Sequence, residues 1–295
     1  MTELAILTPT ATEIRPTLMR WSEYRRSRQW LPATPGQPGA NWIEYPTITG
    51  DSLHGKLVFV PPGHACPLTV AQGDVVLLGV EGELDLQLGD TPQCMKPLDL
   101  VVIPPGVAFS FINAGTSGAL FFATFGGLDP WPFGSSAKPV NAGASAEYLA
   151  WGDYRRDFHW TLPWAERWGF QRGSGPYFAP ETLRGHTVRQ PIAQRTPWHY
   201  AARDLLFMPL SGEVEFSAAG RVWPLEPYDL LLIPAMTPYS YANHGLVESV
   251  FLSVGGKLTP GRKGRYFAED PGWPVRRDAK VMDTEVDPYG DARTV

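Results

Sequence analysis

The residues best suited to chemistry lie in the second half of the chain. His199 stands between two aromatic residues, and Tyr239 and Tyr241 alternate along a later apolar segment. An imidazole titrates near neutral pH and takes up a proton readily, whereas a phenol donates a proton or stabilises an enolate. A histidine beside one or two tyrosines in apolar surroundings therefore predicts proton-transfer chemistry on a small organic molecule.

The segments that must position these side chains are short β runs separated by Gly, Pro and Asn turns, and they occur twice. Residues 55–126 and 185–256 share about 18 of roughly 72 positions at one constant shift, for example 212 − 82 = 130 for Gly82/Gly212. This is an internal duplication. Most of the shared residues are turn formers, so we expect the chemistry where the copies differ.

The duplicated unit begins with an aromatic leader. The pattern Trp-x-x-Tyr-Arg-Arg starts at Trp21 and again at Trp151, and 151 − 21 = 130. Trp and Tyr three residues apart share one face of a helical turn. We expect each leader to pack on its own barrel or on the other one, because its aromatic side chains bury a large area.

Composition excludes several classes of function. The chain has a formal net charge of −5 and no basic patch with interleaved aromatics, which predicts no nucleic-acid partner. No run of about 18 apolar residues exists, and the N-terminal sequence lacks a signal-peptide pattern, so we expect no membrane partner. Cys66 and Cys94 have no counterparts in the second repeat. They predict free thiols and a cytoplasmic location, with one disulfide bridge between them as the alternative.

The turn segments of both repeats resemble the two motifs of the cupin superfamily. The segment from Asp99 to Gly106, with Asn113 following, resembles the second motif, and the turn at Gly82 resembles the glycine end of the first. Two copies in the same order identify a bicupin. The resemblance implies an all-β fold of two tandem double-stranded β-helix (jelly-roll, RmlC-like) barrels. We place the domains at 1–140 and 141–256, followed by a surface tail at 257–295.

The resemblance also implies metal ligands, which are two His and a Glu in the first motif and a His in the second. Most matched places hold other residues, namely Thr69, Val75 and Phe109 in the first repeat and Ala201, Leu205 and Tyr239 in the second. Only His199 takes a ligand position. A divalent metal needs about three or four ligands. We therefore expect no metal site and no cofactor.

These observations give a candidate site in the second barrel. We predict His199 and Tyr239 as catalytic residues, and as substrate-binding residues Tyr241, Leu205, Phe207 and His186. The sequence does not decide whether His186 points inward. Asp204 is a candidate to orient His199, but Asp74 holds the same place in the other repeat, which favours a role in a turn. Structural aromatic packing is the alternative for both tyrosines.

The leading hypothesis is a bicupin that binds a small molecule and acts as a metal-independent isomerase, cyclase or lyase. One alternative is a metal-dependent cupin dioxygenase with atypical ligands. Another is a non-catalytic binding or scaffold protein. Self-association as a homo-oligomer is expected from the aromatic leaders and the tail.

Overall fold

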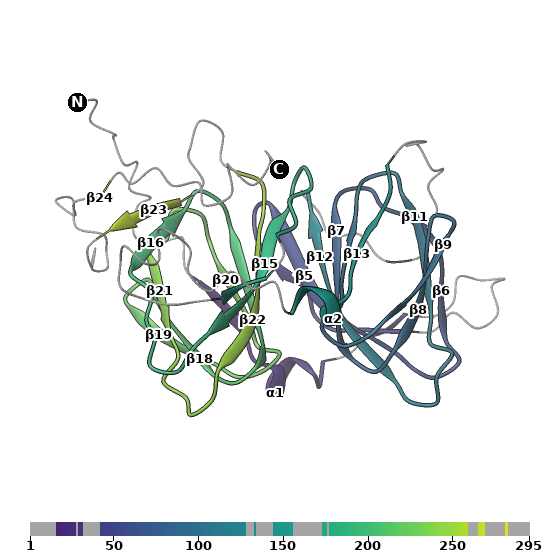
Figure 1. Ribbon diagram of the computed structural model, residues 1–295, viewed down its shortest axis with the longest axis horizontal. Coiled ribbons are helices and arrows are strands. Elements are labelled where there is room, and N and C mark those ends of the chain that lie inside the picture. Colours follow the sequence, from purple (N-terminus) through teal and green to yellow (C-terminus); the bar gives the residue numbers. More distant parts are fainter. Residues whose placement is uncertain are drawn as a thin grey trace.

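The computed structural model describes residues 16–27, 29–31, 42–127, 133, 144–155, 173–175, 177–258, 265–268 and 281–282. Most of these residues lie in antiparallel strands that form two barrels side by side (Figure 1). The helices α1 (Trp21–Tyr24) and α2 (Trp151–Tyr154) are single turns. The predicted all-β fold of two tandem barrels is confirmed.

Each barrel is built from two facing sheets. In the first barrel the larger sheet contains β2 (Gln29–Leu31), β3 (Trp42–Glu44), β4 (Ile48–Thr49), β5 (Leu53–Val60), β7 (Val75–Glu81), β10 (Leu100–Ile103), β12 (Ala119–Gly126) and β13 (Glu147–Leu149). The smaller sheet contains β6 (Ala65–Val70), β8 (Leu84–Leu88), β9 (Thr91–Met95) and β11 (Ala108–Ile112).

The second barrel repeats this plan. One sheet contains β1 (Thr17–Met19), β14 (Gly173–Ser174), β15 (Arg184–Gln190), β17 (Leu205–Ser211), β20 (Leu230–Ile233) and β22 (Ser249–Gly255). The other contains β16 (Trp198–Ala201), β18 (Val214–Ala218), β19 (Arg221–Leu225), β21 (Tyr239–Ala242), β23 (Arg265–Ala268) and β24 (Val281–Met282). Strand β23 comes from the chain after the second repeat and pairs with β16.

Alternation along the strands explains why β7 is apolar throughout. Val75 and Leu77 point into the first barrel, whereas Val76 and Leu78 point into a second core that lies between the two barrels. Because side chains alternate across a strand, a strand covered on both faces needs a continuous apolar run. The continuous apolar run of β7 is therefore explained by burial on both faces.

The two barrels approach closely at Gly55. A Cβ atom at this residue would lie 2.4 Å from Cδ2 of Leu206, which belongs to the other barrel. Phe122 and Leu206 both belong to the core between the barrels. Gly55 therefore permits the larger sheet of the first barrel to pack against the sheet of the second barrel that contains β17.

The leaders cross from one repeat to the other. Strand β1 pairs with β20 of the second barrel, and β13 pairs with β10 of the first. Asp229 accepts a hydrogen bond from the Trp21 amide at 2.7 Å, and Asp99 accepts one from the Trp151 amide at 2.7 Å. The strand pairing and these hydrogen bonds of each leader are therefore made with the other barrel, and the Trp21 ring also contacts Tyr45 of its own repeat, with the centroids 5.1 Å apart.

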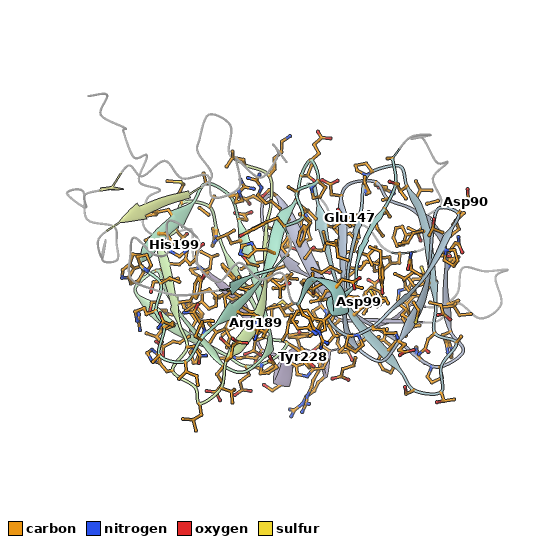
Figure 2. All side chains as sticks on the ribbon, viewed as in Figure 1. Asp90, Asp99, Glu147, Arg189, His199 and Tyr228 are labelled. Atoms are coloured by element: carbon orange, nitrogen blue, oxygen red, sulfur yellow. The ribbon has the colours of Figure 1, made fainter. Side chains whose placement is uncertain are left out.

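Each leader also stabilises a strained turn. Tyr228 and Leu98 have φ values of 70° and 71°, which non-glycine residues adopt rarely. The Tyr24 hydroxyl donates to the Tyr228 carbonyl at 2.6 Å, and the Tyr154 hydroxyl donates to the Leu98 carbonyl. Asp99 and Tyr228 both lie near the junction of the barrels (Figure 2).

We expect these two hydroxyls to make the fold sensitive to alkaline pH. Burial is the main cause that raises the pKa of Tyr24 and the pKa of Tyr154 above the usual range, with Asp229 and Asp99 respectively adding to it. The folded chain thus holds these protons more tightly than the unfolded chain. The contribution of these two hydroxyls to the free energy of unfolding is fully present below the unfolded pKa of about 10, and it falls as the pH rises above that value.

Urea unfolding of the wild type and of the Tyr24→Phe/Tyr154→Phe variant at pH 8 and pH 11 measures this effect. The variant is less stable at pH 8 by about 1 kcal/mol for each lost hydrogen bond. It is expected to lose less stability than the wild type between the two pH values. An equal loss in both proteins would contradict the prediction.

Two further expectations can be compared with the structure. Cys66 and Cys94 are both free, as predicted. No helix within the described ranges is long and apolar enough to cross a membrane. The boundary near residue 140 lies outside the described residues and stays a prediction.

Candidate functional site

The structure brings His199 and Tyr239 together inside the second barrel. They are cross-strand partners on β16 and β21, and their ring centroids lie 4.0 Å apart. His199 is 0% exposed and Tyr239 is 1% exposed. Figure 2 labels His199 on its strand in the second barrel. An imidazole and a phenol therefore meet in a site shielded from bulk water.

The Pro197 carbonyl selects the tautomer of the neutral His199 ring. Nδ1 of His199 lies 2.8 Å from the carbonyl oxygen of Pro197. Because a carbonyl oxygen only accepts hydrogen bonds, Nδ1 carries the hydrogen of the neutral ring and Nε2 carries the lone pair. This tautomer makes Nε2 the basic atom of the site.

Asp204 does not serve His199 in any hydrogen bond described by the structure. Its carboxylate accepts hydrogen bonds from the amides of Asp51 and Ser52 in the first repeat, at 2.7 and 3.1 Å. It also accepts one from the Ala235 amide at 3.0 Å. Asp204 thus connects the two repeats. This role differs from both sequence-based interpretations, which were orienting His199 and forming a local turn.

Aromatic side chains form the wall around the pair. Tyr241 lies 6.1 Å from the His199 ring, and Phe207 lies 5.6 Å from the Tyr239 ring, measured between centroids. Leu205 belongs to the same buried core. The structure adds two residues that the sequence analysis missed, Phe216 and Phe251. The apolar alternation of Val214–Ala218 is the signal that identifies Phe216 as inward-facing.

His186 points into the same barrel. It pairs across the sheet with Ser253, two residues from the pair of Val188 with Phe251, whose side chains both lie in the barrel core. Its ring lies 4.8 Å from the ring of Tyr177, another residue that the sequence analysis missed. The open question of its orientation is thus answered as inward.

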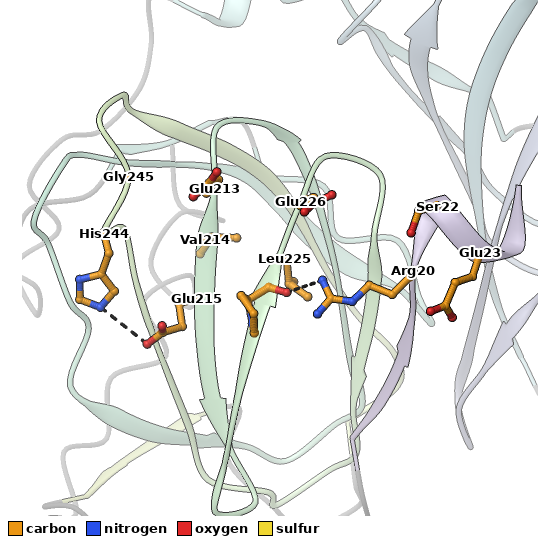
Figure 3. A pocket seen from close by; sticks show the side chains of 11 residues that line it. Arg20, Ser22, Glu23, Glu213, Val214, Glu215, Leu225, Glu226, His244 and Gly245 are labelled. Carbon is orange, nitrogen blue, oxygen red and sulfur yellow. Dashed lines mark hydrogen bonds and ion pairs between the residues drawn. The ribbon is translucent and has the colours of Figure 1, made fainter.

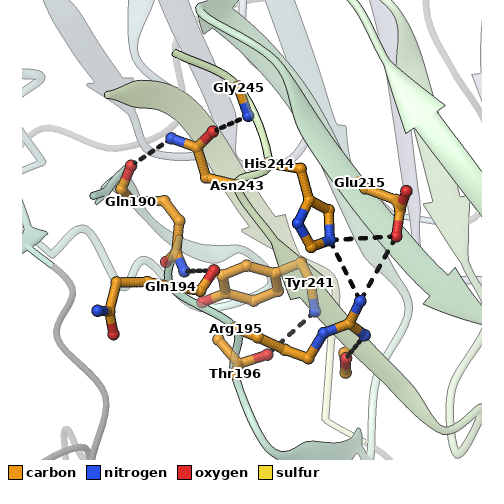
Figure 4. A network of polar contacts seen from close by, with 10 residues as sticks. Gln190, Gln194, Arg195, Thr196, Glu215, Tyr241, Asn243, His244 and Gly245 are labelled. Atoms are coloured by element: carbon orange, nitrogen blue, oxygen red, sulfur yellow. Dashed lines mark hydrogen bonds and ion pairs between the residues drawn. The ribbon is translucent and has the colours of Figure 1, made fainter. Parts of the chain in front are cut away.

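Polar contacts fix the strand that carries Tyr241. The Thr196 hydroxyl accepts a hydrogen bond from the Tyr241 amide at 3.0 Å (Figure 4). The next inward polar side chain, Asn243, donates to the Gln190 carbonyl at 2.9 Å. The matched Asn113 donates to the Val60 carbonyl at 2.8 Å. These contacts belong to the shared backbone of the barrels, whereas the His–Tyr pair occurs in one repeat.

A pocket of about 390 Å³ lies outside the second barrel, between the first leader and strands β18 and β19 (Figure 3). Its lining is rich in glutamate, and Nε2 of His244 lies 3.6 Å from Oε1 of Glu215. None of the predicted site residues lines it. An acidic lining alone does not identify a ligand, so the His199 site remains the candidate.

The resemblance to cupins implies a metal inside the barrel. The residues present at the matched places can be compared with the usual metal ligands. Within the described part of the chain, no group of three His, Cys, Asp or Glu side chains is arranged to hold a metal ion. At the matched places of the second barrel only His199 is an ordinary ligand, beside Leu205 and Ala201. The described residues do not fit the usual ligand set.

Comparison with solved structures gives several matches of the whole fold. Salicylate 1,2-dioxygenase from Pseudaminobacter salicylatoxidans has a TM-score of 0.62 and 14% sequence identity, with 87% of each chain covered. A variant of this enzyme in complex with gentisate has a TM-score of 0.62 and 15% identity, with 86% of this chain and 84% of that chain covered.

AerE from Microcystis aeruginosa is also similar, with a TM-score of 0.54, 13% identity, and coverage of 78% of this chain and 96% of AerE. No protein-family description and no curated protein matches the sequence. At these identities the likeness concerns the fold.

One expectation is corrected by this comparison. From the lost metal ligands we expected no cofactor. Two of these structures are dioxygenases, and metal-dependent dioxygenases were the alternative class. The inference from substituted positions to a chain without a cofactor is therefore wrong, because the same fold serves dioxygenase chemistry.

The architecture and the sequence motifs now agree. Both repeats form jelly-roll barrels, the motif turns lie at matched places, and the similar solved structures extend over both barrels. The chain has a fold of two tandem jelly-roll barrels like that of these solved structures, and its motif turns resemble those of the cupin superfamily.

Proposed function

We propose that the second barrel binds a small organic acid beside the His199–Tyr239 pair, and that these two residues exchange protons with it. The 4.0 Å contact between the two buried rings carries this proposal. His199 acts as the base through Nε2, because the Pro197 carbonyl holds the hydrogen on Nδ1. Tyr239 acts as the acid or stabilises the enolate that forms.

The internal duplication supports this assignment. The first barrel has Thr69 where the second has His199, and Phe109 where the second has Tyr239. Both Thr69 and Phe109 are fully buried, so the barrel fold does not require the His–Tyr pair at these places. A pair that the architecture does not require is best explained by function.

The apolar wall supports acid–base chemistry as well. Phe207, Tyr241 and Phe251 are each 2% exposed or less. Electrostatic and hydrogen-bonding interactions are stronger in such surroundings than in water. The wall is also suited to an aromatic or otherwise apolar ligand body, for which salicylate and gentisate, named in the similar structures, are the first compounds to examine.

Isothermal titration calorimetry with salicylate, gentisate and phenylpyruvate tests the proposal. We expect the His199→Ala variant to lose one binding site per chain for the acid that binds, while circular dichroism shows the same fold. Thr69→Ala, at the matched place of the first barrel, is the control and keeps that site. Unchanged binding in His199→Ala would exclude the proposed role. Binding without any chemical change of the ligand would identify the non-catalytic alternative.

A dioxygenase is the second candidate, and the full-length likeness to salicylate 1,2-dioxygenase favours it. Metal analysis by mass spectrometry and oxygen uptake with salicylate and gentisate distinguish the two candidates. Near-stoichiometric metal together with oxygen uptake that a chelator abolishes would establish the dioxygenase. Proton exchange that persists under the same chelator would establish the first candidate.

A further inference from the structure

The interior of the first barrel holds two basic residues on β5, His54 and Lys56. His54 pairs across the sheet with Phe125, and Lys56 pairs with Ala123. Cross-strand partners share one face of a sheet. Phe125 and Ala123 both belong to the core inside the first barrel. His54 and Lys56 therefore face the barrel interior, where they are 1% and 3% exposed.

Lys56 forms an ion pair with a carboxylate. Its Nζ lies 2.5 Å from Oε2 of Glu44, and Oε1 of Glu44 accepts a hydrogen bond from Trp42 at 3.1 Å. The ammonium also lies 5.2 Å from the ring centroid of Phe125 and 5.3 Å from that of Phe133. An ammonium has three N–H donors, so donors beyond the one directed at Glu44 exist on this atom.

His54 is different, because both of its ring nitrogens are buried without a hydrogen-bond partner among the described residues. A buried polar group left in this state is unfavourable for folding, and such groups in native proteins require an explanation. A ligand bound inside the barrel that makes a hydrogen bond to His54 is one such explanation.

The second barrel repeats the basic pair. The shift gives 54 + 130 = 184 and 56 + 130 = 186, so Arg184 and His186 take the two places. They lie on β15 in register with Gly255 and Ser253, on the same face as Val188. Most residues shared by the repeats are turn formers, but this pair lies within a strand. Basic character on this strand therefore has no role in a turn.

We propose that the first barrel is a second, independent binding site for a small organic acid. The carboxylate accepts hydrogen bonds from Lys56 and from a ring nitrogen of His54. The apolar part of the acid packs against Phe125 and Phe133, which already lie around the ammonium. This site does not use His199 or Tyr239, so it is separate from the function proposed for the second barrel.

Calorimetric titration of the His199→Ala variant with benzoate and with acetate tests the proposal. In this background the second barrel is disabled, and we expect one remaining site per chain for at least one of the two probes. Adding His54→Leu should weaken that binding about 10- to 100-fold, as expected for a lost hydrogen bond to a charged group. Replacing the ion pair by Lys56→Met/Glu44→Gln should weaken it at least as much.

Unfolding without ligand serves as the control for folding. His54→Leu removes a polar group that lacks a partner and is expected to leave the melting temperature unchanged or higher. Two results would overturn the proposal. One is the absence of saturable binding of both probes to His199→Ala at millimolar concentrations. The other is a His54→Leu variant that binds as tightly as its parent.

Discussion

We expect the His199→Gln substitution to slow enzyme-catalysed proton exchange in the second barrel by about 10²- to 10⁴-fold, the usual contribution of a general acid or base. Phenylpyruvate is a suitable probe, because the C–H bonds beside its carbonyl exchange with solvent through an enolate. Glutamine retains a buried polar side chain of similar length but has no basic nitrogen. Nuclear magnetic resonance in deuterated water follows the exchange directly.

Tyr239→Phe should reduce this exchange to a similar extent without loss of folding. The first repeat already has phenylalanine at the matched position, Phe109, where it is fully buried. Thr69→Ala in the first barrel should leave the rate unchanged. Exchange at the wild-type rate in both His199→Gln and Tyr239→Phe would remove the basis for acid–base chemistry at this site.

We expect Asp204→Ala to destabilise the fold by about 3–5 kcal/mol, because several buried N–H donors lose their acceptor at once. The carboxylate accepts hydrogen bonds from the amides of Asp51, Ser52 and Ala235, and it is 4% exposed. Asp74 makes the equivalent contacts to the amide and hydroxyl of Thr182, so Asp74→Ala should have a similar effect.

Urea unfolding followed by circular dichroism measures these changes. Asp204→Asn keeps one acceptor oxygen and should fall between the wild type and the alanine variant. Asp90→Ala, at an exposed turn, is the control and should change the free energy of unfolding by about 0.5 kcal/mol or less. If the free energy of unfolding of Asp204→Ala lies within about 1 kcal/mol of the wild-type value, Asp204 does not hold the repeats together.

Strand alternation was sufficient to predict much of the candidate site. Tyr239 and Tyr241 share the inward face, as a period of two residues requires. The same rule did not orient His186, because its strand is buried on both faces and Thr187 is as buried as its neighbours. Without a solvent face, the sequence of such a strand carries no polar–apolar pattern.

Contacts between the repeats were harder to predict. The aromatic leaders show that a surface must be covered, but their pattern does not say which barrel supplies it. The sequence favoured a local turn role for Asp204, because Asp74 occupies the matched position in the first repeat. Two equivalent residues related by approximate twofold symmetry can equally well contact each other's repeats. Lys56 was missed because lysine within a strand is normally exposed to solvent.

The crossed leaders impose an order on folding during synthesis. Strand β13, which covers the edge of β10 in the first barrel, is made after all other described strands of that barrel. Strand β1 is made first, but its partner β20 is made more than 200 residues later (230 − 19 = 211). During synthesis, the edge of β10 in the first barrel therefore stays unpaired until residues 147–149 have left the ribosome. An unpaired edge can pair with a strand of another chain. Pairing of β13 with β10 therefore protects the first barrel against aggregation.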